Sequence, residues 1–203
     1  MILHSELRGM NEMDMLSFLK EKKNELDTVI HPFAYKDSSF KYLYCFGLGV
    51  LAFGHMKAIT ETKNCFEEIL DAINLHQTYR DRIIIDINNN FDSKINEVLE
   101  VIDTKEKQYT FCADLFKLCA VSLWSQSFTD GVLKIYMKIF KFSKEEREFI
   151  ENFTKASKKK NIIVARSLYN DFIDNGYVIS YKLLKYMCPS FQLEEEYDSI
   201  ILN

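Results

Sequence analysis

The chain has 203 residues, a formal net charge of −4 and 47% hydrophobic residues. This length fits one domain with terminal additions and is enough to bury a hydrophobic core. The negative charge excludes the strong positive field that draws many proteins to nucleic acids. The only run of three lysines, Lys158 to Lys160, neutralises too few phosphates for useful affinity and is typical of a solvated turn between helices. We expect no nucleic-acid partner.

The five cysteines form an odd set without a Cys-x-x-Cys pair, which argues against a disulfide framework and a zinc knuckle. We expect them to be small buried residues of a cytoplasmic protein. Charged residues, among them Glu6, Arg8 and Glu12, interrupt the first segment, which therefore does not predict a secretory signal. The most apolar stretch, Tyr42 to Gly54, is shorter than the roughly 20 residues that cross a bilayer. It predicts a buried helix and no transmembrane segment.

Apolar residues recur at helical spacing, and only two prolines and six glycines interrupt the chain. We therefore predict an all-α fold, a compact bundle of about seven to nine helices. Asn11 is a suitable N-cap for a first helix that ends near Leu26, and His31-Pro32 ends the segment that follows. The apolar stretch after it contains small residues that would let another helix approach closely: Gly47, Gly49, Ala52 and Gly54.

Two helix boundaries have chemical signals later in the chain. Ser143 with Glu146 fits a capping box, in which each side chain satisfies a backbone N–H of the first helical turn. A helix is therefore expected to begin there. Asn175-Gly176 predicts a helix end, since both residue types tolerate the left-handed conformation that ends helices. The residues after Pro189 are expected to form an acidic tail.

An internal repeat organises the middle of the chain. Residues 44–83 align without gaps on residues 111–150, at an offset of 67. Amphipathic helices of equal length can fall into phase by accident, but two pseudo-repeated helical triads are the simplest interpretation. We expect a core at residues 40–157, an N-terminal helical extension at 1–39, and a C-terminal helical extension with an acidic tail at 158–203. The aligned pairs include Leu48 with Leu115, Phe66 with Leu133, Leu70 with Met137, and Arg80 with Arg147.

The clearest stretches of the repeat are Leu133 to Ile150, LKIYMKIFKFSKEEREFI, and its counterpart Phe66 to Ile83. Each follows an apolar helix rich in small residues and a polar turn, and each leads into a charged third helix. This order resembles the TerB-like family, the tellurite-resistance type of helical domain also found at the N-terminus of DjlA-type membrane co-chaperones. The resemblance covers about residues 40–157 and rests on the pattern of helices. It implies an all-helical core.

In the TerB-like family, the turn between the first two helices of a unit usually carries an Asp-Gly pair and then a glutamate, groups suited to a divalent cation. The first such turn of this chain has one carboxylate, Glu61. The second has Asp130 before Gly131, but Lys134 and Lys138 follow where a glutamate would stand. Hard cations need several oxygen ligands at once. We therefore expect no cofactor, with Glu61 and Asp130 as weak candidate ligands for a cation.

Residues 86–97 match the ligand positions of an EF-hand loop, but the sixth position, which needs the sharp turn of glycine, is Phe91. The candidate calcium ligands are Asp86, Asn88, Asn90, Asp92 and Glu97. The alternative interpretation is an amphipathic helix, with the asparagines facing water or ending it. Its core-facing residues would be Ile83, Ile84, Ile87 and Phe91.

Catalytic signals are absent from the sequence, which contains no HExxH, GxSxG or P-loop pattern. We therefore expect no enzyme, and the remaining enzymatic alternative is a hydrolase whose groups, such as Cys45 and His55, converge from distant positions. The leading hypothesis is a non-enzymatic module that binds a protein, and a divalent-cation sensor is the alternative. The resemblance suggests bacterial stress response, phage defence or toxin immunity as its setting.

The partner surface is expected in two regions, the turn before the second helix of the second triad and the tyrosine-rich segment near the C-terminus. Tyrosine suits such surfaces because it offers a large apolar area with a polar tip at little entropic cost. The candidate partner-binding residues are Trp124, Ser125, Phe128, Asp130, Tyr177 and Tyr181.

Overall fold

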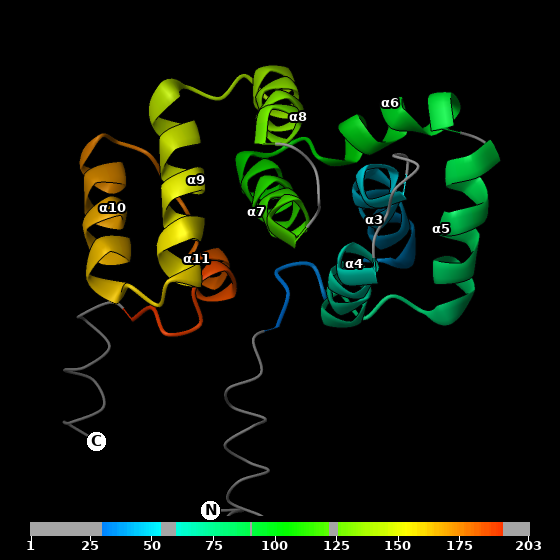
Figure 1. The fold of residues 1–203 in the computed structure, drawn as a ribbon, viewed down its shortest axis with the longest axis horizontal. Coiled ribbons are helices and arrows are strands. Elements are labelled where there is room, and N and C mark those ends of the chain that lie inside the picture. Colours follow the sequence, from blue (N-terminus) through cyan, green and yellow to red (C-terminus); the bar gives the residue numbers. More distant parts are fainter. Residues whose placement is uncertain (1–29, 54–59, 90, 122–125, 193–203) are drawn as a thin grey trace, which may run out of the picture.

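A computed structural model describes residues 30–53, 60–89, 91–121 and 126–192. Every regular element in these ranges is an α-helix, which confirms the all-α prediction. None of these helices is long and apolar enough to cross a bilayer. The helices, labelled in Figure 1, are α3 (Ser38–Phe53), α4 (Thr60–Ala72), α5 (Gln77–Asn89), α6 (Phe91–Val101), α7 (Lys105–Val121), α8 (Gln126–Ile139), α9 (Lys144–Lys158), α10 (Ile162–Asp174) and α11 (Tyr181–Met187).

The helices are arranged around two buried ones. Helices α3 to α6 lie at one end of the molecule and α9 to α11 at the other, with α7 and α8 between them (Figure 1). Helix α3 packs against α4, α5, α6 and α7, and α7 in turn packs against α8, α9 and α11. One hydrophobic core therefore runs from Phe33 to Phe191 through both ends of the bundle.

The helix boundaries of the structure recur at the offset of the predicted sequence repeat. Helices α3 and α7 begin at Ser38 and Lys105, and α5 and α9 begin at Gln77 and Lys144, both pairs at the offset of 67. Helices α4 and α8 end at the same offset. The bundle therefore contains two triads, α3–α4–α5 and α7–α8–α9, as the sequence predicts.

The turn inside each triad is also repeated. Asn74 and Lys141, again 67 residues apart, have left-handed φ angles of 56° and 53°. In both turns the next residue donates its N–H back to the last turn of the helix, Leu75 to the carbonyl of Leu70 (3.0 Å) and Phe142 to that of Met137 (2.9 Å). These bonds satisfy helix carbonyls that would otherwise lack partners, and they end α4 and α8.

Two of the predicted helix boundaries are confirmed, and the predicted first helix from Asn11 to about Leu26 lies outside the described residues. Ser143 caps α9, and its side chain and that of Glu146 form both bonds of the capping box. Asn175 is the C-cap of α10, and Gly176 follows with a φ of 82°. The lysine run is exposed at the end of α9, where Lys160 has a φ of 53° in the turn to α10, as expected of a solvated turn.

Glycines of α3 admit neighbouring helices closely. A Cβ at Gly47 would lie 2.6 Å from Cγ1 of Val98 in α6 and 3.3 Å from Cε2 of Phe111 in α7. A Cβ at Gly49 would lie 2.9 Å from Cδ1 of Ile87 in α5. Gly47 and Gly49 therefore serve contacts inside the bundle, and Gly54 lies outside the described residues.

This packing predicts opposite outcomes for two glycine-to-alanine substitutions. Gly47→Ala should lower the free energy of unfolding by about 1–3 kcal/mol, because the β-branched Val98 side chain cannot move aside freely. Gly131→Ala, at a helical position with nothing within 4 Å of the added carbon, should raise it by about 0.5–1 kcal/mol. Urea unfolding of both variants measures the difference, and equal effects would contradict the close packing of α3.

Candidate functional site

A surface groove with a volume of about 400 Å³ lies between α8 and α9. Its floor is apolar and consists of the partly buried Phe116 from α7 with Leu133 and Met137 from α8. Its rims are charged, and they are formed by Asp130, Lys134, Lys144, Arg147, Glu148 and Glu151.

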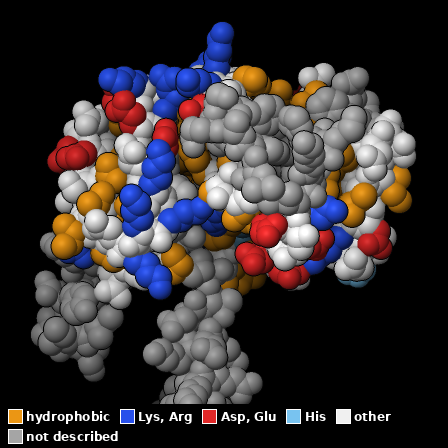
Figure 2. All heavy atoms as spheres, viewed as in Figure 1, with side chains coloured by type: hydrophobic (Ala, Val, Ile, Leu, Met, Phe, Trp, Pro, Cys, Tyr) orange, Lys and Arg blue, Asp and Glu red, His pale blue; other side chains and the backbone are white. Residues whose placement is uncertain are grey.

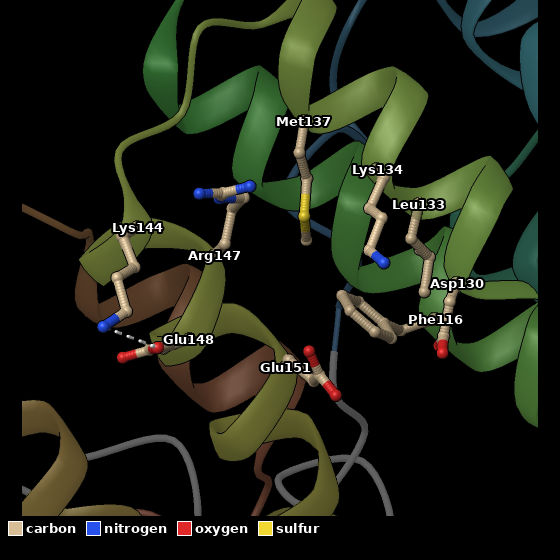
Figure 3. A pocket seen from close by; sticks show the side chains of 9 residues that line it. All are labelled: Phe116, Asp130, Leu133, Lys134, Met137, Lys144, Arg147, Glu148 and Glu151. Atoms are coloured by element: carbon tan, nitrogen blue, oxygen red, sulfur yellow. Dashed lines mark ion pairs between the residues drawn. The ribbon is translucent and has the colours of Figure 1, made fainter.

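The rim charges are segregated along the groove. The lining residues come from one stretch of each helix, Asp130 to Met137 on α8 and Lys144 to Glu151 on α9. Figure 3 shows Arg147 and Lys134 on either side of Met137, and Phe116 at the other end between Glu151 and Asp130. The groove therefore has a basic end and an acidic end, with apolar side chains along its floor.

A smaller cavity of about 190 Å³ lies on the other side of α9, between α9 and α10. Its wall contains stacked rings: Phe149 lies on Phe172 with centroids 4.0 Å apart, and Phe172 lies on Tyr177 at 4.8 Å. Glu148 lines this cavity as well as the groove, so the two hollows are separated by one ridge of α9.

A buried carboxylate lies two residues before Phe116 on α7. Asp114 of α7 is fully buried and accepts hydrogen bonds from Nε2 of His31 (2.9 Å), the Tyr44 hydroxyl (2.8 Å) and the Tyr186 hydroxyl (2.5 Å). Lys117 Nζ lies 3.4 Å from the same carboxylate and 3.4 Å from the centroid of the Tyr186 ring. Burying an ionised carboxylate costs much free energy unless hydrogen-bond donors and a cation compensate for the lost solvation, as they do here.

The electrostatics of this cluster follow from those contacts. Burial raises the pKa of Asp114, but the positive charge of Lys117 and the hydrogen bonds from His31 and Tyr186 outweigh it and lower the pKa to about 2. Burial also lowers the pKa of Lys117, and it raises the pKa of Tyr44 well above its ordinary value. Asp114 is therefore the charged centre, and the tyrosines around it stay protonated donors.

The histidine–aspartate pair in this cluster is structural. Nδ1 of His31 accepts the backbone N–H of Phe33 at 3.0 Å, while Nε2 faces Asp114, so both ring nitrogens are engaged. His31 is fully buried as well. A general base must reach the proton that it removes, and this imidazole has no nitrogen left for a substrate.

Two further buried carboxylates bond to tyrosines at equivalent positions of the two triads. Tyr109 of α7 donates to Glu146 at 2.5 Å, and Lys105 lies 2.8 Å from the same carboxylate. Its counterpart Tyr42 of α3 donates to Asp86. The tyrosine is repeated at the offset of 67, but its partner comes from the first turn of α9 in one triad and from the last half of α5 in the other.

The EF-hand candidates do not lie together in a loop. Asp86 is buried in α5, with Arg82 at 3.2 Å and Lys94 at 3.6 Å, and Asn88 is exposed on the same helix and donates to the carbonyl of Ile84. Glu97 is exposed in α6. Asn90 lies outside the described residues, and Asp92 is in α6, although its side chain is not described. In the alternative stripe, Ile83 and Ile87 are buried, whereas Ile84 is 47% exposed.

The remaining metal and thiol candidates are scattered. Glu61 is exposed in the first turn of α4, in a different triad from Asp130. Among the described residues, no group of three or more His, Cys, Asp or Glu side chains is placed to hold a metal ion. Cys65 is half-buried and the other four cysteines are buried, and all are free. Burial raises the pKa of Cys119 to about 12. His55, suggested as a partner of Cys45, lies outside the described residues.

The partner-surface candidates fall in three places. Asp130 lines the groove, and Tyr177 lines the smaller cavity, where its hydroxyl bonds to Ser143 at 2.8 Å. Tyr181 is partly buried and packs against the core at the start of α11. Trp124 and Ser125 lie outside the described residues, and Phe128 is in α8, although its side chain is not described.

Sequence reasoning missed most of the groove and the Asp114 cluster. A signal for the groove was available in the repeat. At the offset of 67, charged positions align as well as apolar ones, and lysines of α8 stand at the positions that acids occupy in α4. For Asp114 the signal was weaker, a single carboxylate in the apolar run FCADLF. Its partners come from three distant segments, which only the fold brings together.

Comparison of the chain with family models, curated proteins and solved structures finds no match. The groove and its charges are therefore the basis on which a function is proposed.

The contacts of Asp114 predict a pH-dependent contribution to stability. Its pKa is lower in the folded protein, about 2, than its ordinary value of 3.8, so the contribution is fully present above pH 3.8 and is lost as the pH falls through 2. Asp114→Asn should lower the free energy of unfolding at pH 7 by about 3 kcal/mol, because it removes one partner of a buried ion pair.

Urea unfolding between pH 2 and pH 7 tests this expectation. The wild type should lose about 2 kcal/mol more than the variant over the acid range, since each pKa unit corresponds to about 1.4 kcal/mol. Parallel stability curves for the two proteins would show that Asp114 does not carry the charge inferred here.

Proposed function

We propose that this protein is a non-enzymatic helical module that binds an amphipathic helix of a partner protein in the groove between α8 and α9. The observation that supports this is a groove with charged rims whose floor contains the partly buried Phe116, with the buried Leu133 and Met137 beside it. A hydrophobic groove with polar edges is the usual receptor of the apolar face of a helix. Rim charges of both signs would set the orientation of that helix.

The dimensions of the groove fit this occupant. Its volume of about 400 Å³ is in the range of small binding pockets, roughly 300–1,000 Å³. Its lining residues run from Asp130 to Met137 on α8 and from Lys144 to Glu151 on α9, about 11 Å along each helix at 1.5 Å per residue. A partner helix would therefore contact the groove over about two turns.

The alternative of a cation sensor has less support. Asp86 already faces two cationic side chains, and Glu61 and Asp130 belong to different triads. The TerB-like resemblance suggests bacterial stress response, phage defence or toxin immunity as the setting in which the partner acts.

A site-specific cross-linking experiment tests the proposal. A photo-reactive amino acid at Lys134, on the groove rim, should give a discrete adduct with one partner protein in the cells that naturally make this protein. The same amino acid at Lys63, an exposed position of α4, is the matched control because it occupies a helix of the other triad. Adducts of equal yield at both positions, or none at Lys134, would contradict a partner in the groove.

A further inference from the structure

The two triads differ in charge at a place where their backbones repeat. In the first triad, Arg80 of α5 reaches across to α4, where its Nη1 lies 2.6 Å from Asp71 and 3.6 Å from Glu67. Its Nε also donates to the carbonyl of Leu75 at 2.7 Å. This arginine therefore bridges the second and third helices of the first triad.

In the second triad the same position is Arg147, but the acids have been replaced. The counterparts of Glu67 and Asp71 are Lys134 and Lys138, both exposed on α8. Arg147 donates through Nε to the carbonyl of Ser143 at 3.2 Å, and it makes no ion pair among the described residues. Three cations therefore stand at the level where the first triad has a bridge of one cation and two anions.

The floor differs as well. Phe116 stands at the position of Gly49, so a large, partly buried ring forms the base of the second groove where the first triad has no side chain. In the first triad the space beside Gly49 is filled by Ile83, Ile87 and Phe66. The second triad thus offers a partly buried aromatic ring between the basic end of the groove, with Lys134 and Arg147, and its acidic end, with Asp130 and Glu151.

We propose that the helix bound in the groove carries an acidic side chain that pairs with Arg147 and Lys134, one turn from an apolar side chain that packs on Met137 and Phe116. The inference rests on the proposed function. The partner carboxylate would supply to Arg147 what Asp71 and Glu67 supply to Arg80 within the chain. Arginine suits this role because its guanidinium accepts a carboxylate in a bidentate geometry.

The surface charge of the molecule agrees with an acidic partner. Lysine and arginine side chains follow the face formed by α9, interspersed with acidic ones, whereas acidic side chains gather over α4 (Figure 2). The exposed acids of α4 include Glu61, Glu67, Glu68 and Asp71. A helix with acidic residues would therefore be drawn towards α9 and repelled from α4, and salt would weaken this preference.

The test uses the purified full chain and a displayed library of helical peptides of about 14 residues, the length of α8, with charged and apolar positions randomised. Selected peptides should carry Asp or Glu one turn from an apolar anchor. A synthetic copy of a selected peptide should bind about five- to tenfold more tightly than its twin in which the acid is replaced by the matching amide. Calorimetry or fluorescence anisotropy measures both.

A variant of the protein provides the second arm. Lys134→Glu with Lys138→Asp recreates the acids of α4, which should bridge to Arg147 and weaken the acidic peptide about tenfold or more, with an unchanged or higher melting temperature. Lys63→Glu with Lys36→Asp makes the same change in net charge at exposed positions away from the groove and should leave binding nearly unchanged.

The Phe116→Ala variant separates the two hypotheses. Peptides that lose affinity in Phe116→Ala but show no preference for acid would overturn the acidic partner and leave the groove as a helix-binding site. A library that yields no peptide dependent on Phe116 would overturn the proposed function itself, and the acidic partner with it.

Discussion

The buried carboxylate of Asp114 is the constraint on which the arrangement of the bundle depends. Its three hydrogen-bond donors come from the segment before α3, from α3 and from α11, and each lies 70 to 83 residues from Asp114 in the sequence. Because an ionised carboxylate without partners is very costly in a core, these segments must meet at α7 for the fold to form. Phe116 of the groove floor lies on the same helix, two residues after Asp114, whereas Leu133 and Met137 lie on α8.

The two triads share one backbone arrangement but differ in the surface between their second and third helices. An ion-pair bridge spans this surface in the first triad, and a groove lies there in the second. Equivalent turns, helix starts and core positions give both triads the same frame, while the exposed residues of α4 and α8 are free to differ because they contribute little to the core. Acids on α4 let Arg80 bridge to it. With lysines on α8, Arg147 makes no ion pair among the described residues, and a groove lies between α8 and α9.

Much of the fold was predictable because its signals are local. The capping box at Ser143, the helix end at Gly176 and the apolar repeat depend on residues a few positions apart, and each is present as expected. The glycines of α3 indicated close packing without showing what packs there, and Val98 and Phe111 were not identifiable because they lie 51 and 64 residues from Gly47. The candidate site was only partly predictable. Asp130 and Tyr177 were named from the sequence, but Phe116, Met137 and Arg147 are recognisable as site residues only because they line one cavity.

The sequence by itself determined that this protein is all-helical, that its middle is a repeat of three helices, and where several of those helices begin and end, since periodicity and capping act within a few turns. The tertiary structure alone decided that His31, Tyr44 and Tyr186 converge on Asp114, that Asp86 faces cations in place of a metal loop, and that the surface between α8 and α9 is hollow. These features depend on contacts between segments that are distant in the sequence. Such contacts form only on folding, when burial makes an unpaired charge costly.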